Sequence, residues 1–184
     1  MNILFYCPSK FNLDKKTTAS LGGVETLNLH LSNALAKIGY NVYLCTECKK
    51  ISKKKNLINI PTSEIIHKNK DVFFDYIISS NESKIFDKFK LSKKIFWMHN
   101  TLSLEKAFRK GKLLSLLRNE ITTVFVSKYL EKITSKSYLF NKRFVIPNFL
   151  SSEFTIDKIN YKRKKIIVWS VQRHRGINET LNMW

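Results

Sequence analysis

The sequence predicts an α/β domain with a doubly wound, mostly parallel sheet, and two observations point to it. Short runs that are apolar throughout alternate with longer amphipathic runs, and polar or glycine-rich residues repeatedly follow the apolar runs. Strands without polar alternation are typical of a parallel sheet that helices cover on both faces. With 184 residues, the chain is long enough for one domain with a proper core but not for two.

The first strand and the first helix have the clearest patterns. Residues 2–6 form an apolar run that ends at Cys7-Pro8, and a helix is expected over 22–38 after a polar loop. Its apolar stripe consists of Val24, Leu27, Leu31, Leu35 and Ile38. Gly39 then stands where a helix commonly ends in a left-handed residue.

Six further strands complete the expected domain, at residues 41–45, 57–60, 76–79, 94–98, 123–126 and 143–146. Shorter helical stretches are expected around 84–89 and 128–137. Residues 151–165 turn polar and basic, as a linker does, before a buried-type strand at 166–169 and the beginning of a helix at 176–184. One strand and one partial helix cannot bury their apolar faces, so we expect them to be the start of a second domain that is cut short.

Composition and charge limit the function. Hydrophobic residues make up 43% of the chain and aromatic residues 12%, which excludes a disordered protein, and no apolar run is long enough to span a bilayer. The 33 Lys and Arg against 14 Asp and Glu give a net charge of +19, which attracts nucleic acid, anionic membranes or phosphorylated substrates unless it is simply solvated surface. The amino terminus lacks a secretory signal pattern, so the cytoplasm is the expected location.

The three cysteines indicate neither redox chemistry nor a metal site. Cys45 and Cys48 form a Cys-Thr-Glu-Cys pair, but the pair follows a strand and precedes lysines instead of opening a helix, where thiolates are favoured. No second pair supplies the remaining ligands of a zinc site, so buried or incidental thiols are expected here and at Cys7.

Polar residues follow the expected strands, and ligands of open parallel sheets bind at that edge. They are Gly22, Gly23 and Glu25 after the first strand, then His99, Asn100, Ser127 and Asn148, and after the linker Arg173 and Arg175. The glycines open a helix whose free N–H groups could hold a phosphate. Neither the dinucleotide fingerprint nor a Walker phosphate loop is present.

This order of elements resembles glycosyltransferases of the GT-B fold, in particular the retaining family four. The resemblance runs through nearly the whole chain, in Gly22-Gly23-Val24-Glu25, Trp97-Met98-His99-Asn100, Val126-Ser127-Lys128, Val145-Ile146-Pro147-Asn148 and Ile167-Val168-Trp169-Ser170 with Arg173 and Arg175. It implies a Rossmann-like, acceptor-side domain over 1–150, a linker over 151–165, and the first part of the donor-binding domain over 166–184.

The resemblance also implies roles for particular residues. Gly22 and Gly23 would face the cleft near the donor diphosphate, His99 would contact the donor sugar, and Arg173 and Arg175 would hold the donor phosphates. The implied reaction moves a sugar, such as a hexosyl group, from a nucleotide-diphosphate sugar to a glycan or lipid-linked acceptor in cell-surface polysaccharide or glycoconjugate synthesis. Cationic side chains and a helix N-terminus would stabilise the departing diphosphate, so no metal cofactor is expected.

Of four candidate cleft residues, two keep two interpretations. Glu25 is either a ligand residue or a first-turn acid that the helix dipole favours. Asn148 either lines the cleft or caps the crossover between domains, and Asn100 and Ser127 share the strand-end position.

The chain departs from the family in lacking the paired glutamates and nucleotide-recognition loops of the donor domain. We therefore expect little or no transferase activity from the chain alone. One alternative is a noncatalytic or split-subunit partner of a glycosyltransferase. Another is a nucleic-acid-binding module, which is not expected because no helix-turn-helix, zinc or RNA-recognition signature is present.

Residues 101–120 also keep two interpretations. Their leucines, mixed with lysine and arginine, suit a helix that lies in an anionic membrane interface, on the inner face of the cell membrane. The alternative is a helix pair that is broken near Gly111 and packs its leucines on the core.

Overall fold

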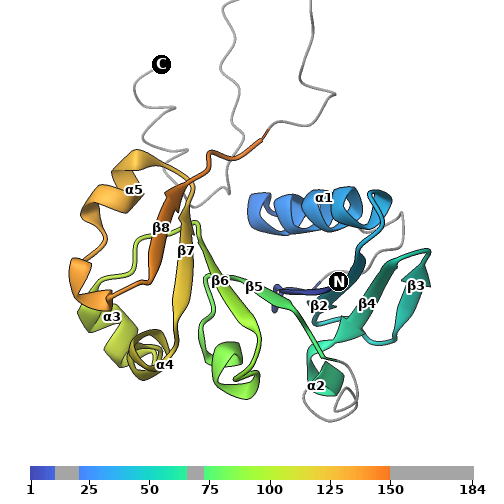
Figure 1. The fold of residues 1–184 in the computed structure, drawn as a ribbon, viewed down its shortest axis with the longest axis horizontal. Coiled ribbons are helices and arrows are strands. Elements are labelled where there is room, and N and C mark those ends of the chain that lie inside the picture. The colour runs from blue at the N-terminus through green and yellow to red at the C-terminus, as the bar shows by residue number, and fades with distance from the viewer. Residues whose placement is uncertain (11–20, 66–72, 150–184) are drawn as a thin grey trace, which may run out of the picture. The chain divides into compact units, whose positions relative to one another are not determined.

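The computed structural model describes residues 1–10, 21–65 and 73–149 and is an α/β fold built on one eight-stranded sheet (Figure 1). The strands are β1 (Asn2–Tyr6), β2 (Asn41–Thr46), β3 (Ser52–Lys54), β4 (Leu57–Pro61), β5 (Tyr76–Ser80), β6 (Lys93–Met98), β7 (Ile121–Phe125) and β8 (Lys142–Val145). Their order is β3-β4-β2-β1-β5-β6-β7-β8, and every neighbouring pair is parallel except β3 with β4. The expected α/β class with a mostly parallel sheet is confirmed, and the sheet is compatible with a Rossmann-like fold.

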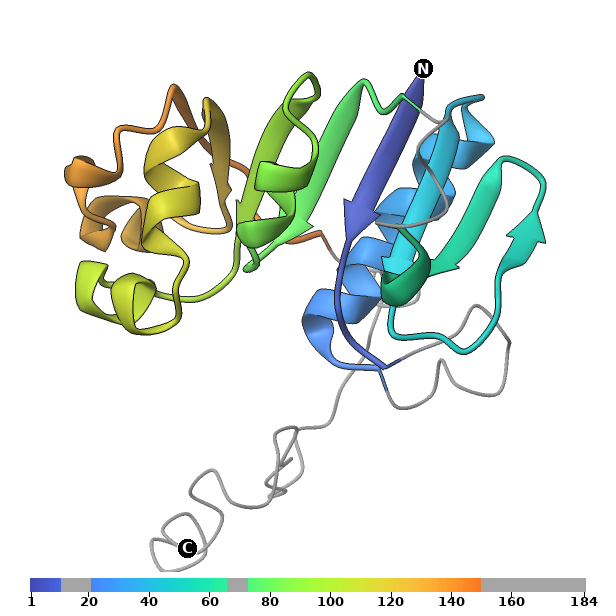
Figure 2. The same ribbon diagram turned by 90° about the horizontal axis from the view of Figure 1, so that it is seen from below.

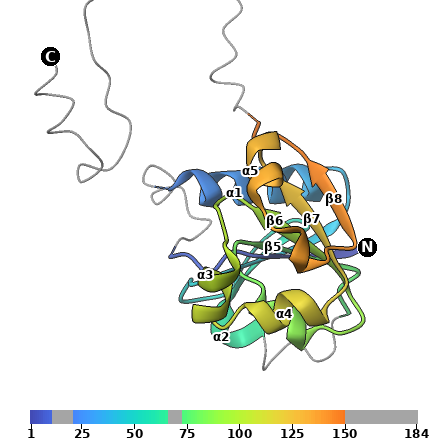
Figure 3. The ribbon, with the colours of Figure 1, turned by 90° about the vertical axis from the view of Figure 1, so that its left-hand side faces the viewer.

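The helices of the described residues lie on both sides of this sheet. They are α1 (Gly23–Lys37), α2 (Thr62–Ile65), α3 (Leu104–Arg109), α4 (Leu113–Arg118) and α5 (Lys128–Ile133), with single 3-10 turns η2 (Lys84–Lys88) and η3 (Lys136–Tyr138). Figure 3 shows α1 on one side and α2 and α4 on the other. Helix α1 covers a core cluster around Phe5, Leu44 and Trp97, whereas the cluster around Leu4, Phe86 and Phe96 lies on the opposite face.

The winding of the sheet reverses between β1 and β5. The chain builds outward from β1 through β2 to β4, and then returns to the other side of β1 to form β5, β6, β7 and β8 in turn. The connections that leave β1 and β5 therefore lead to opposite sides of the sheet. Such a reversal of strand order leaves a crevice at the carboxyl ends of the two strands, where ligands of such sheets bind. Helix α1 begins at this edge, near the arrowheads of β1 and β2 (Figure 2).

Most expected elements are present, and the differences have local causes. Gly39 follows α1 with a φ of 102°, as expected for a left-handed residue at a helix end. Strand β3 was not predicted because Ser52–Lys54 has no apolar residue; it pairs only with β4, at the edge of the sheet. The stretch at 128–137 is divided into α5 and η3, and the stretch at 84–89 is the 3-10 turn η2. The expected linker and second-domain segment, 151–184, lies outside the described residues.

Candidate functional site

The first turn of α1 presents Glu25 at the carboxyl edge of the sheet. Gly22 precedes the helix in an extended conformation, and Glu25 is the acidic residue of the first turn. A Cβ atom added to Gly22 would lie 2.5 Å from Oε2 of Glu25, so the carboxylate rests against the glycine. Around Gly23 the space is open within 4 Å. The missing side chain at Gly22 therefore lets Glu25 fold back over the helix N-terminus, where the dipole favours a negative charge.

A buried polar pair fixes α1 to the sheet at the reversal point. Nδ2 of Asn28 donates hydrogen bonds to Oγ of Ser80 (2.8 Å) and to the carbonyl of Val24 (2.8 Å), and Oγ of Ser80 lies 3.2 Å from Oδ1 of Asn28. Both side chains are buried. Because Ser80 ends β5 and Asn28 lies in the second turn of α1, this pair sets the position of Glu25 relative to the strands.

His99 follows β6 on the face of the sheet that α1 covers. Its backbone N–H donates to Oδ1 of Asn81 (3.0 Å), and its ring lies 4.7 Å from the ring of Trp97, centroid to centroid. Burial lowers the pKa of His99 to about 4, partly opposed by the nearby charge of Glu25. The imidazole is therefore neutral at pH 7, when it can both donate and accept a hydrogen bond.

The Nε2 atom of His99 is buried and has no hydrogen-bond partner among the described residues. A buried polar atom that is left unpaired costs about 1–3 kcal/mol, a cost that a ligand bonded to this atom would offset. The charge of Glu25 is near enough to act on the His99 ring, so the two side chains are candidates to act on one ligand.

Cys7 completes the corner from the end of β1. Burial raises the pKa of its thiol to about 11; the hydrogen bond from Sγ to Oγ of Ser9 lowers it, and Glu25 raises it further. Burial also raises the pKa of Cys45, to about 12. All three cysteines are buried and free. The raised pKa values of Cys7 and Cys45 keep these two thiols protonated at neutral pH, which makes them poor nucleophiles. Across residues 1–10, 21–65 and 73–149, no group of three His, Cys, Asp or Glu is arranged to hold a metal ion.

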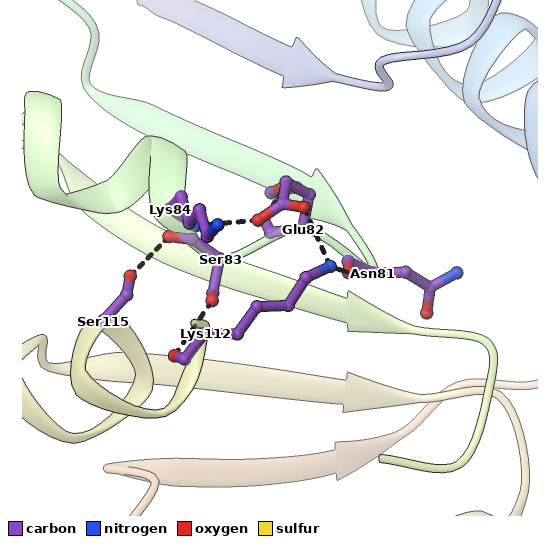
Figure 4. A network of polar contacts seen from close by, with 7 residues as sticks. Asn81, Glu82, Ser83, Lys84, Lys112 and Ser115 are labelled. Carbon is purple, nitrogen blue, oxygen red and sulfur yellow. Dashed lines mark hydrogen bonds and ion pairs between the residues drawn. The ribbon is translucent and has the colours of Figure 1, made fainter. Parts of the chain in front are cut away.

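A second polar cluster, not predicted from the sequence, surrounds Asn81, whose side chain accepts the hydrogen bond from the N–H of His99 (Figure 4). Asn81 has a φ of 58°, and its carbonyl accepts a hydrogen bond from Nζ of Lys112 (2.7 Å). The same ammonium group forms a salt bridge with Glu82 (2.8 Å). Ser115 donates to the carbonyl of Ser83 (2.6 Å), which ties α4 to the same loop. The polar run Ser79-Ser80-Asn81-Glu82 at the end of a strand was the signal in the sequence that could have found it.

The remaining predicted site residues are dispersed. Ser127 caps α5, since its side chain accepts a hydrogen bond from the N–H of Leu130 (3.1 Å), so this hydroxyl has a structural role. Asn100 is exposed next to His99, and Asn148 is exposed beyond β8. Arg173 and Arg175 lie outside the described residues. From the predicted set, the structure thus places Glu25 against Gly22 and near enough to His99 for its charge to act on the imidazole.

A large open depression, about 1160 Å³, lies at the opposite edge of the sheet. Lys93, Lys142 and Arg118 line it together with Asp87 and Glu120 at the amino ends of the strands. Ligands of this sheet class bind beyond the carboxyl ends, so the depression is separate from the site described above.

Comparison with known proteins leaves the family of this chain open, since no family model matches it. A stretch of 145 residues is 30% identical to part of a MATH and LRR domain-containing protein of Plasmodium falciparum. The match covers 74% of this chain but 1% of that protein, so the chain spans about one hundredth of the relative's length. A match to so small a part does not show what the chain is. Within the described part of the chain, no helix has the length and apolar character needed to cross a membrane.

Proposed function

We propose that the chain supplies the acceptor-side domain of a GT-B glycosyltransferase related to the retaining family four. The enzyme would transfer a sugar from a nucleotide-diphosphate sugar to a hydroxyl of a glycan or lipid-linked acceptor. The observation that supports this most is the unpaired, neutral His99 at the carboxyl edge where the sheet reverses, near enough to Glu25 for its charge to act on the imidazole. The proposal also rests on the sequence resemblance.

Each group has a distinct part in the proposed reaction. A neutral His99 would hydrogen-bond a sugar hydroxyl without adding a charge near the reacting carbon. The departing diphosphate needs positive groups, which Arg173, Arg175 and the N-terminus of α1 would supply. Because Glu25 now occupies that N-terminus, a phosphate near Gly22 and Gly23 requires the Glu25 carboxylate to turn away.

The test is a transfer assay with the full-length product of the gene and a panel of sugar nucleotides. His99→Ala should lower kcat/KM by about tenfold or more, the loss of one hydrogen bond of about 1.4 kcal/mol in the transition state. His30→Ala is the matched control, because His30 is an exposed histidine in the middle of α1, and it should leave kcat/KM within about twofold. The 184-residue chain alone should show little or no turnover. Equal activity of the His99 variant and the wild type would exclude the assigned role, and absence of transfer from every donor would exclude the function.

A second proposal concerns the surface of α3 and α4, which we infer to lie against an anionic membrane. The break at Gly111 is present, with a φ of 62°. Ala107 and Leu116 pack into the core, but four apolar side chains of the two helices do not: Leu104, Phe108, Leu114 and Leu117 are all exposed, Phe108 to 74%. The sequence alternative in which the leucines pack on the core therefore holds for only part of the pair.

Basic residues surround these apolar side chains. The same two helices and the turn after α3 carry Lys106, Arg109, Lys110 and Arg118. Exposed apolar groups next to cations match the two layers of an anionic membrane interface, the acyl boundary and the headgroups.

Sedimentation with vesicles of phosphatidylglycerol and phosphatidylcholine at low salt tests this surface. Replacing both Phe108 and Leu114 by serine should weaken binding by about tenfold or more, because each apolar side chain contributes about 1–2 kcal/mol when buried. Ile51→Ser is the control, since Ile51 is exposed beside β3 at the far edge of the sheet. Wild-type protein that stays in the supernatant, or a double variant that sediments like the wild type, would contradict the membrane proposal.

A further inference from the structure

A small cavity of about 210 Å³ opens at the carboxyl edge, on the face opposite α1. Phe96 and Met98 of β6 belong to its lining, as do Asn81 and Asn100. Both strand residues belong to the core cluster on the face away from α1. The cavity is thus distinct from the corner that holds Glu25 and His99, although Asn100 is the residue next to His99.

Three lysines line this cavity, and the structure explains how they come together. Lys106 and Lys110 are four residues apart at the end of α3, so they lie on one side of the helix. Gly111 then turns the chain in a left-handed conformation, and Lys112 follows it. Like charges at this spacing on a helix are unfavourable. A bound anion would remove that repulsion.

The three ammonium groups have different partners. Lys112 is committed to Glu82 (2.8 Å) and to the carbonyl of Asn81 (2.7 Å). Lys106 donates to the carbonyl of Thr101 (3.2 Å), a neutral group that leaves its charge uncompensated. The ammonium group of Lys110 has neither a hydrogen bond nor an ion pair with any residue that the structure describes, although the backbone N–H of Lys110 donates to the carbonyl of Lys106 (3.1 Å). The carboxylate of Glu82 thus compensates the charge of Lys112, and the positive charges of Lys106 and Lys110 are not compensated by an ion pair with a described residue.

We propose that this cavity binds the phosphate group of a phosphorylated ligand. Ammonium groups bind phosphate as point charges with several donors, and the side-chain amides of Asn81 and Asn100 offer further donors at the same cavity. The phosphate belongs either to a lipid headgroup or to a soluble phosphorylated sugar. That it belongs to the acceptor rests on the proposed function; the binding itself does not.

Two titrations at constant ionic strength test the site, one with inorganic phosphate and one with phosphatidylcholine vesicles that contain phosphatidic acid. Binding is followed through the backbone amide signals of Asn100 and Thr101. Lys110→Gln and Lys106→Gln should each weaken binding about tenfold, since each removes one charge-assisted contact. Lys54→Gln is the matched control, an exposed lysine on β3 at the far edge of the sheet. It should leave binding unchanged.

The outcomes distinguish a soluble phosphorylated ligand from a lipid headgroup, and they distinguish failure of the cavity proposal from failure of the proposed function. Lysine-dependent binding of inorganic phosphate supports a soluble ligand, and lysine-dependent binding of the vesicles alone supports a lipid headgroup. Unchanged binding in both cavity variants, or an equal loss in the Lys54 variant, would overturn the site and leave only general attraction by a basic surface. Phosphate binding without any sugar transfer by the full-length product would count against the proposed function but not against the cavity.

Discussion

Replacing Asn28 by alanine is expected to lower the free energy of unfolding by about 3 kcal/mol, because the change leaves a small cavity and an unpaired hydroxyl in the core. The lost groups are specific. Nδ2 of Asn28 bonds to Ser80 and to the carbonyl of Val24, both at 2.8 Å, and the Asn28 side chain is fully buried. Urea unfolding, followed by far-UV circular dichroism, measures the change.

A double-mutant cycle with Ser80→Ala shows whether the pair acts as a unit. The sum of the losses of unfolding free energy in the two single variants should exceed the loss in the double variant by about 1 kcal/mol. In the double variant neither side chain is left in the core without its hydrogen-bond partner. Asn33→Ala is a control on the same helix, where Nδ2, as far as the described residues go, bonds only to the carbonyl of Leu29 (2.8 Å). It should change stability by less than about 1 kcal/mol. Additive losses at Asn28 and Ser80 would show that the pair does not fix α1 to β5.

The second large effect is a loss of stability in mild acid that depends on His99. In the folded protein the pKa of His99 is about 4, against an ordinary value of 6.5. As the pH falls below 6.5, the unfolded chain takes up a proton that the folded protein takes up only near pH 4. The stabilisation is therefore complete above pH 6.5 and lost as the pH falls to 4, by up to about 3 kcal/mol.

Unfolding free energies at pH 7 and pH 4.5 test this loss. Carboxylates also titrate at the acid end, so the informative quantity is the difference between the wild type and His99→Gln. The variant should lose about 2 kcal/mol less than the wild type over this range. A His30→Gln control should lose as much as the wild type. If the His99 variant lost as much too, the imidazole would not be buried in its neutral form.

Local patterns predicted the scaffold of the site well. The apolar stripe from Val24 to Leu35 and the glycine after it located α1 to within one residue at each end, since periodicity and helix termination are local properties. The strands that carry Cys7 and His99 at their ends were found from apolar runs alone. Parallel sheets place such ends at one edge, so the position of Glu25 and His99 at the same edge followed from the fold class.

What the sequence could not predict depends on contacts between distant residues. Asn81 and Lys112 are 31 residues apart, and neither residue alone indicates that their loops meet. The helical period of 101–120 identified apolar side chains but not which of them reach the core: Leu116 does, whereas Leu114 remains 60% exposed. The lysine-lined cavity was hidden for the same reason, because Gly111 is needed to bring Lys112 beside Lys106.

The central claim is that the corner formed by Glu25 and His99 binds a sugar nucleotide. The most direct measurement is a titration with sugar nucleotides of the protein with isotope-labelled histidines, in which the NMR signals of the imidazole rings report binding. We predict that at least one nucleotide-diphosphate sugar shifts the His99 signals saturably at pH 7 and leaves those of His30 in place. Glu25→Gln should change the size of the His99 shift, because the carboxylate lies at the same corner. Sugar nucleotides that bind the full-length protein while the His99 signals stay fixed would contradict the account.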